Sequence, residues 1–205
     1  MEEQILEITK KASKLFHRYG IKSVSMDDIA RELSISKKTL YKLFKDKKDL
    51  VSKVLTCPNN NDLDDVSFDK NLNAIEKHIQ TYEKIISFLS ELNPSFEYDL
   101  KKYYPKLYRE AFKRRRSFIY DSMHRTLAQG VKEGFFRSDM DIHIVNTMNI
   151  IRIEGFKTMD IKEVYNRDLL DVVKEFFSYH FHAIATEKGR KEFERIIKER
   201  GNAKN

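Results

Sequence analysis

Apolar residues recur at helical spacing from the beginning of the chain. In residues 2–19 they follow steps of three and four and form one stripe: Ile5, Ile8, Ala12, Leu15, Phe16 and Tyr19. Gly20 comes next and supplies a helix stop, because glycine readily adopts the left-handed conformation that ends many helices. The pattern predicts an amphipathic helix over residues 2–19 with one buried face.

Side chains that cap helices mark three further starts. Ser25, Ser36 and Asp46 each stand directly before a short stretch of helically spaced apolar residues. Such a side chain accepts hydrogen bonds from the first free N–H groups of a helix. Asp28, three residues after Ser25, completes the pattern of a capping box. Residues 1–55 are therefore expected to form four helices in a small bundle, two of them short and joined by a tight turn.

Turn-forming residues gather between positions 56 and 65, and we take this segment as a domain boundary. The first domain then covers residues 1–55 and the second covers 56–205. The second domain contains six longer helical patterns: 69–92, 95–104, 106–133, 141–159, 165–184 and 187–200. The chain has only 6 Gly and 3 Pro, so the expected fold class is all-α, with a three- or four-helix bundle followed by a larger all-helical domain.

The positive charge is concentrated in the first domain. The formal net charge is +7, and residues 1–55 hold 13 Lys and Arg against 8 Asp and Glu. A basic segment attracts phosphate polyanions, although many basic proteins bind none. No apolar run approaches the roughly 18 to 20 residues of a membrane span, and the acidic start is unlike a secretory signal. We expect a cytoplasmic protein whose single cysteine, Cys57, forms no internal disulfide.

The stretch from Ser25 to Leu50 has the organisation of a helix-turn-helix, in which one helix braces a second that enters the major groove of DNA. Six apolar residues would form the core between the two helices: Ile29, Ala30, Leu33, Ile35, Leu40 and Phe44. The side chains left to face outwards are Lys37, Lys38, Thr39, Tyr41 and Lys42. A solvated helix face is the alternative interpretation of such a lysine cluster, but the two-helix context favours DNA.

This stretch resembles the N-terminal domain of the TetR/AcrR family of bacterial regulators. The spacing agrees at Ser25, Ile29, Ala30, Leu33, Ile35, Ser36, Thr39, Leu40, Tyr41, Phe44, Lys47 and Leu50. The resemblance implies that the residues positioning the DNA backbone are Ser25, Thr39, Tyr41 and Lys47. The groups nearest to base edges or phosphates would be Lys37, Lys38 and Lys42. Ser34 departs from the family, which usually has glycine in the turn, so this serine is expected to adopt a left-handed conformation.

Residues 130–139 resemble the segment that precedes the dimerisation helices of the family. The resemblance implies a homodimer in which 141–159 and 165–184 pair with their copies in a four-helix bundle. The apolar residues that suit such a surface include Ile144, Val145, Met148, Ile151, Leu169, Val172, Val173, Phe176 and Phe177. They suit an intramolecular core equally well. A dimer is also expected because one short helix reads too few base pairs.

Twenty of the 24 Phe and Tyr residues lie beyond residue 55. They would line an apolar ligand cavity or simply fill a core. By resemblance to the family, a small apolar or aromatic molecule would bind here and lower the affinity for DNA. The candidate ligand-binding residues are Phe88, Tyr104, Tyr108, Phe112, Phe118 and Met148.

Catalytic and metal-binding patterns are missing from the sequence. We find no phosphate-binding glycine loop, nucleophile elbow, metal-spaced Cys/His set or triad, so neither an enzyme nor a metal or cofactor site is expected. The basic run at 113–116 is expected to be a solvated helix face, with flanking DNA as the alternative. The sequence thus predicts a homodimeric TetR-like transcriptional regulator, a repressor released from its operator by a small molecule. The alternative is a ligand-independent architectural or partner-recruiting DNA-binding protein, and a closed, ligand-sized cavity would discriminate between the two.

Overall fold

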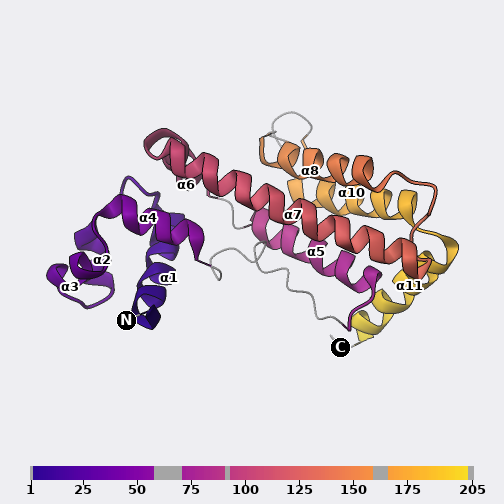
Figure 1. The fold of residues 1–205 in the computed structure, drawn as a ribbon, viewed down its shortest axis with the longest axis horizontal. Helices are drawn as coiled ribbons and strands as arrows, with labels where there is room; N and C mark the ends of the chain where they lie inside the picture. The colour runs from indigo at the N-terminus through magenta and orange to yellow at the C-terminus, as the bar shows by residue number, and fades with distance from the viewer. Residues whose placement is uncertain (1, 58–70, 91–92, 159–165, 203–205) are drawn as a thin grey trace. The chain divides into compact units, whose positions relative to one another are not determined.

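The computed structural model describes residues 2–57, 71–90, 93–158 and 166–202, with the side chains of 88–90, 157–158 and 201–202 left out. Within these ranges the chain is helical apart from its connections, which include one isolated β-bridge between Phe136 and Ala185. The helices, labelled in Figure 1, are α1 (Glu2–Tyr19), α2 (Met26–Glu32), α3 (Lys37–Leu43), α4 (Lys47–Thr56), α5 (Ala74–Ser90), α6 (Pro94–Tyr103), α7 (Pro105–Glu133), α8 (Ile142–Thr158), α10 (Leu169–Ile184) and α11 (Glu187–Asn202). The predicted all-α class is confirmed.

The short N-terminal helices begin at the capping residues that the sequence indicates. Ser25 and Asp28 form both halves of a capping box, with N···O distances of 3.1 Å and 2.9 Å. Ser36 accepts from the N–H of Thr39 at 3.0 Å, and the Asp46 side chain caps α4 in the same way. Each cap satisfies a donor that has no partner inside its helix, which fixes where α2, α3 and α4 begin.

The chain forms two compact units, which are described separately. Unit 1 comprises residues 1–65 and 91–115, and unit 2 comprises 66–90 and 116–205. The segment 91–115, which contains α6 and the start of α7, thus groups with the N-terminal helices. The boundary expected at 56–65 lies mostly outside the described residues, so the division into domains 1–55 and 56–205 stays a prediction.

Unit 1 is built around the buried face of α1. Phe16, Leu40 and Phe44 are fully buried there, together with Ile29 and Leu50. The six-residue core expected between α2 and α3 forms as predicted, with Leu33 and Ile35 half-buried at its edge. Helix α6 adds to this unit, where its Leu100 joins the same core.

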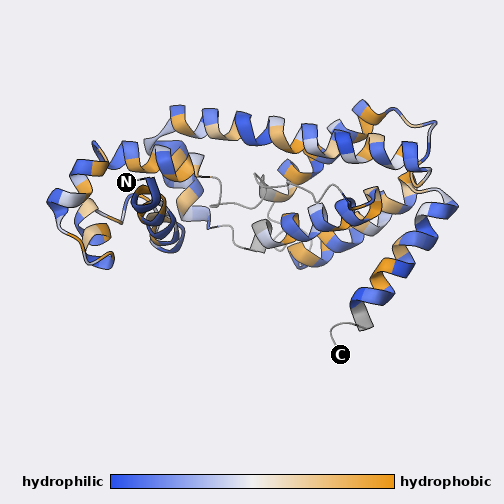
Figure 2. Ribbon diagram, turned by 60° about the horizontal axis from the view of Figure 1, so that its bottom comes forward, coloured by the Kyte–Doolittle hydropathy of each residue, from blue (hydrophilic) through white to orange (hydrophobic). Residues whose placement is uncertain are grey.

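Unit 2 is built around α5, against which α10 and α11 pack. Four aromatic rings fill much of its interior, contributed by Phe136, Phe177, Phe181 and Phe193. The Phe136 ring lies directly over Gly130 of α7, where an added Cβ would stand only 2.0 Å from the ring. Hydrophobic residues follow one side of most helices and hydrophilic residues the other (Figure 2). The core of unit 2 therefore depends on contacts between helices far apart in the sequence.

Candidate nucleic-acid interface

The turn between α2 and α3 is held by two backbone hydrogen bonds. The N–H of Ser34 donates to the carbonyl of Arg31 at 3.1 Å, and the N–H of Ile35 donates to the carbonyl of Ala30 at 3.0 Å. This pattern is a Schellman motif, which requires a left-handed residue just after the helix. Ser34 takes that role with φ 54°, so the left-handed serine predicted from the sequence is confirmed.

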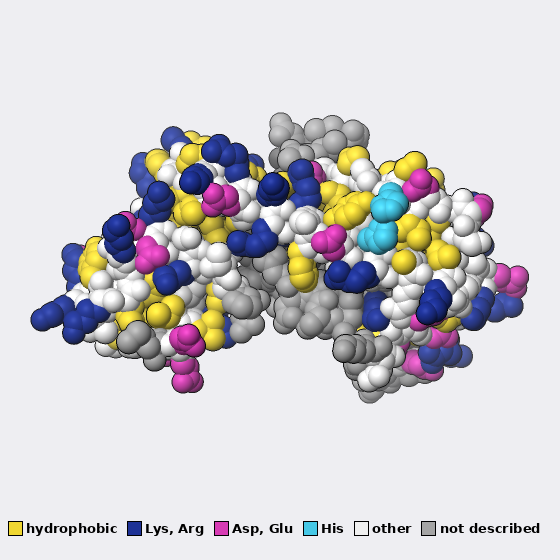
Figure 3. Space-filling view, viewed as in Figure 1, with side chains coloured by type: hydrophobic (Ala, Val, Ile, Leu, Met, Phe, Trp, Pro, Cys, Tyr) yellow, Lys and Arg dark blue, Asp and Glu magenta, His cyan; other side chains and the backbone are white. Residues whose placement is uncertain are grey.

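Helix α3 has one buried side and one exposed side. Leu40 is fully buried, whereas Tyr41 is 44% exposed and Lys37, Lys38 and Lys42 are exposed. Unit 1 also presents many Lys and Arg side chains over the face seen in Figure 3. The structure therefore places three ammonium groups and a phenol on the outer side of α3, whose inner side is anchored in the core of unit 1 by Leu40. This arrangement suits contact with phosphates and base edges in a groove.

Two of the predicted residues of α3 already have partners within the protein. The Lys37 ammonium lies 2.7 Å from an Asp27 carboxylate oxygen, and this hydrogen-bonded pairing raises the pKa of Lys37. The Thr39 hydroxyl lies 2.8 Å from the Ser36 hydroxyl. Both pairs are exposed, where water screens charge and weakens such contacts, so a phosphate competes readily with them.

Ser25 and Lys47, the other two predicted residues, are tied to the framework of unit 1. The Ser25 hydroxyl donates to Asp28 at 2.6 Å in addition to capping α2. Lys47 is half-buried with Nζ 3.5 Å from the carbonyl oxygen of Lys22. Burial lowers the pKa of Lys47, while the nearby carboxylates of Asp99 and Asp28 oppose that shift. Their roles at the DNA backbone remain predictions.

Residues 8–54 match the model of a family described as bacterial regulatory proteins, tetR family. This match identifies residues 8–54 as similar to the N-terminal domain of that family. An HTH-type transcriptional regulator of Staphylococcus aureus (strain USA300) is 47% identical to the chain over 49 residues. That alignment covers 24% of this chain and 26% of the relative, so the chain spans about a quarter of the length of the curated relatives it matches.

Solved structures resemble the chain over much more of its length. A TetR transcription regulator from Haloarcula marismortui aligns with a TM-score of 0.68 at 16% identity, covering 90% of this chain and 100% of that one. A transcriptional regulator from Saccharomonospora viridis in complex with choline aligns with a TM-score of 0.62 at 21% identity, covering 91% and 100%. At these identities the likeness shows the fold, which the chain shares with both structures over about nine tenths of its length.

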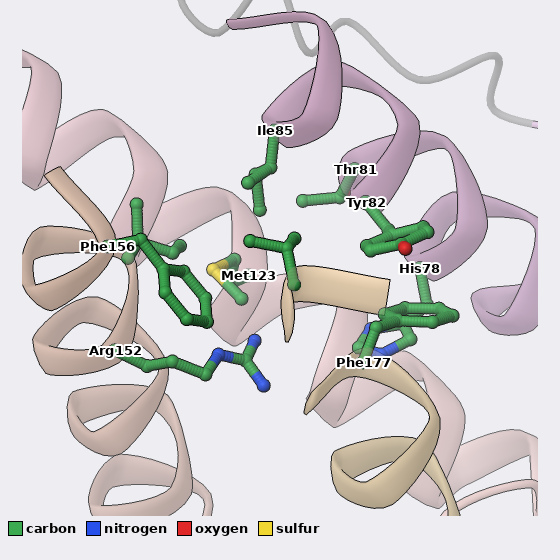
Figure 4. A pocket seen from close by; sticks show the side chains of 10 residues that line it. His78, Thr81, Tyr82, Ile85, Met123, Arg152, Phe156 and Phe177 are labelled. Carbon is green, nitrogen blue, oxygen red and sulfur yellow. The ribbon is translucent and has the colours of Figure 1, made fainter. Parts of the chain in front are cut away.

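The chain has a pocket inside unit 2, formed between α5, α7, α8 and α10 (Figure 4). Its lining residues are His78, Thr81, Tyr82, Ile85, Met123, Arg152, Ile153, Phe156, Val173 and Phe177. About 20 Å³ is open to the centre of a water-sized sphere, which is room for about one water. Sequence reasoning missed this pocket, although Arg152 stands out as a charge within an otherwise apolar run of α8.

Five of the six candidate ligand-binding residues from the sequence do not line this pocket: Tyr104, Tyr108, Phe112, Phe118 and Met148. Tyr104 and Tyr108 pack against the core of unit 1, where Tyr108 stacks on Phe112 with ring centroids 5.6 Å apart. Phe118 is half-buried, Met148 is 63% exposed, and the Phe88 side chain is outside the described residues. The ligand-binding role of these six residues stays a prediction.

Helices α8 and α10 carry an exposed apolar face. Among the described residues, half of the ten large hydrophobic side chains that are exposed belong to these two helices: Ile144, Met148, Ile151, Phe176 and Tyr179. Val173 and Phe177 of α10 point inwards instead and are buried. We call the five exposed residues the α8–α10 face, and the α8 members recur at steps of four and three along one side.

Other expectations concern charge runs, metals and membranes. In the basic run, Arg114 donates to the carbonyl of Leu55 at 2.8 Å and Arg116 pairs with Glu154 at 2.6 Å.

Among the described residues, no group of three His, Cys, Asp or Glu side chains is arranged to hold a metal ion. None of the described helices combines the length and the apolar character that crossing a membrane requires.

Proposed function

We propose that the protein is a homodimeric DNA-binding transcriptional regulator that represses its target until a small molecule releases it. The observation that carries the proposal is the exposed side of α3, with Lys37, Lys38, Tyr41 and Lys42 displayed on a helix-turn-helix of TetR type. Repression is the simplest outcome, because tight operator binding alone occludes a promoter.

A homodimer is supported by the α8–α10 face. Exposed apolar patches of this kind on soluble proteins mark interaction sites, and the five residues of the face are 45% to 73% exposed. A two-fold dimer would double the DNA contacts and match a palindromic operator. The expected recognition unit is therefore two copies of α3, one from each protomer.

A small-molecule response is supported by the pocket of unit 2, and the Saccharomonospora viridis regulator of the same fold binds choline. The ligand-independent architectural function is the second candidate. The observation that favours it is the size of the pocket, whose open volume of about 20 Å³ holds no organic molecule without movement of the lining side chains.

The test is a salt titration of the full-length protein on DNA from upstream of its own gene, with scrambled DNA as control, read by fluorescence anisotropy. We expect sequence-selective binding whose affinity falls steeply with salt, since each phosphate contact releases counterions. Equal, weak binding to both DNAs would contradict the regulator. Selective binding that no small molecule weakens, in a screen with the same assay, would favour the architectural candidate.

A further inference from the structure

Buried side-chain nitrogen atoms without a hydrogen-bond partner lie in and beside the pocket of unit 2. Three such atoms are Nε of Arg152, Nε2 of His78 and Nε2 of His180. Buried polar groups in proteins are normally hydrogen-bonded, so a cluster without partners calls for an explanation. These three residues belong to three different helices, α8, α5 and α10. The geometry of a single helix therefore does not explain why their nitrogen atoms lack partners.

Arg152 brings a positive charge into apolar surroundings. Its side chain extends from α8 into the space between Phe156 and Phe177 (Figure 4). No carboxylate of the described residues pairs with it, and the Phe176 ring centroid lies 5.7 Å from its guanidinium carbon. Burial lowers the pKa of Arg152 to about 10. A buried cation without a counter-charge is unfavourable, so an anion that reached it would be held strongly.

His78 and His180 stand beside this charge. His78 is only 6% exposed, lines the pocket, and stacks on Phe177 with ring centroids 5.1 Å apart. The His180 ring lies 5.8 Å from it. Burial, followed by the neighbouring His180 and Arg152, lowers the pKa of His78 well below its usual value. Burial, followed by Arg152, lowers the pKa of His180 to about 4. Both rings are therefore neutral, and each has an N–H to donate to an oxygen that approaches.

The remaining walls are apolar and partly flat. Phe156, Phe177, Ile85 and Val173 line the pocket, and Tyr82 stacks on Phe177 at 3.9 Å. Such walls suit a planar ring or a short branched chain, while Arg152 disfavours a cation such as a quaternary ammonium. The flexible side chains of Met123 and Arg152 are those that can move aside to enlarge the space.

We propose that this pocket binds a small organic acid, with its carboxylate on the Arg152 guanidinium and the His78 ring N–H, and its apolar body between Phe156 and Phe177. The role of this acid as the releasing ligand rests on the proposed function. The binding itself requires only unit 2.

The experiment compares acids with their neutral isosteres on the full-length protein without DNA. The probes are benzoate and isovalerate, with benzamide and isovaleramide as the matched uncharged molecules, and calorimetry measures affinity. We expect the acids to bind on the order of tenfold or more tightly than the amides, which corresponds to one charge-assisted hydrogen bond. Equal affinity for acid and amide, or no binding of either acid at millimolar concentration, overturns the proposal.

Arg152→Met and Arg125→Met are the matched variants. The methionine at 152 keeps most of the volume and removes the unpaired charge, so this variant should remain folded and be at least as stable as the parent. It should lose the preference for acids over amides. Arg125 is an exposed arginine of α7, and its replacement should leave the preference intact. If Arg152→Met bound the acids as tightly as the parent, the acids would bind at another site and the proposal would be wrong.

Two measurements on the same protein samples test this proposal and the proposed function independently. Sequence-selective DNA binding, measured by anisotropy, fails if the regulator assignment is wrong, whatever the pocket holds. Acid binding measured by calorimetry fails if the pocket assignment is wrong, whatever α3 recognises. When both succeed, added benzoate should weaken DNA binding by the parent and by Arg125→Met, but not by Arg152→Met.

Discussion

Unit 1 and unit 2 differ in how their buried polar groups are paired. In unit 1 the buried carboxylate of Asp99 accepts a hydrogen bond from the N–H of Lys22 at 2.7 Å. In unit 2 the buried Nε of Arg152 has no partner, and neither has Nε2 of His78. This buried carboxylate of unit 1 is thus satisfied within the protein itself. The interior of unit 2 has donors to offer to a molecule that enters.

The two units also expose different surfaces. Unit 1 displays ammonium groups on α3, whereas unit 2 displays the apolar α8–α10 face. A polar, basic surface suits a polyanion, and an apolar one suits a second copy of the chain. In the proposed function, unit 1 therefore binds DNA and unit 2 forms the dimer. Each substitution below changes one of these two units.

Charging the α8–α10 face should have the largest effect. Ile151→Glu buries a carboxylate in the expected interface, which costs several kcal/mol per dimer and should weaken association on the order of 100-fold or more. Sedimentation equilibrium measures this dissociation constant. Ile197→Glu on α11, at a site 45% exposed and outside the face, is the matched control and should leave the dimer unchanged. An unchanged dissociation constant for Ile151→Glu would remove the α8–α10 face from the dimer interface.

A glycine substitution should disturb the interior of unit 2 next most strongly. Gly130→Ala would place a Cβ 2.0 Å from the ring of Phe136, which is 1% exposed and cannot move freely. We expect the free energy of unfolding to fall by about 1 to 3 kcal/mol, as for other overpacked cores. Urea denaturation followed by circular dichroism measures it.

Gly155→Ala is the control for that substitution. A Cβ at Gly155 of α8 would meet nothing within 4 Å, and alanine favours a helix by up to about 1 kcal/mol relative to glycine. This variant should therefore be slightly more stable than the parent. Destabilisation by both alanines to the same extent would show that the packing of Phe136 over Gly130 is not the cause.

The smallest change concerns the turn of unit 1. Ser34 and Gly134 occupy the same position in the same type of helix end, with φ 54° and 75° respectively. Glycine adopts this conformation freely, whereas serine is strained by roughly 1 kcal/mol. Ser34→Gly should stabilise unit 1 by about that amount in thermal unfolding, while Gly134→Ser should destabilise unit 2. A loss of stability in Ser34→Gly would contradict the assignment of strain to this turn.

Local features of the N-terminal helices of unit 1 were predictable from the sequence. The caps at Ser25, Ser36 and Asp46 act within four residues of the helices they start, so their side chains carry the information by themselves. Ser34 was recognisable for the same reason, since its place in the turn decides its conformation. The exposed side of α3 followed from helical periodicity alone.

The pocket could not be derived in this way. Its lining residues lie on four helices and span the sequence from His78 to Phe177. No local sequence pattern shows which faces of these helices meet. Aromatic residues near the middle of the chain were a poor guide, because Tyr104 and Tyr108 pack against the core of unit 1 instead. The useful signal was a single residue, Arg152, whose charge is out of place among the isoleucines of α8.

The most direct test of the account is the DNA affinity of Lys37→Ala/Lys38→Ala/Tyr41→Ala measured by fluorescence anisotropy against Lys132→Ala/Lys198→Ala. The control pair removes two exposed lysines of unit 2, and circular dichroism and sedimentation establish that both variants are folded and assembled. The account predicts that the triple variant loses selective binding and that its salt slope falls by about 0.9 for each phosphate contact removed, while the control binds as the parent does. Retention of selective binding by the triple variant would contradict the placement of DNA recognition on α3.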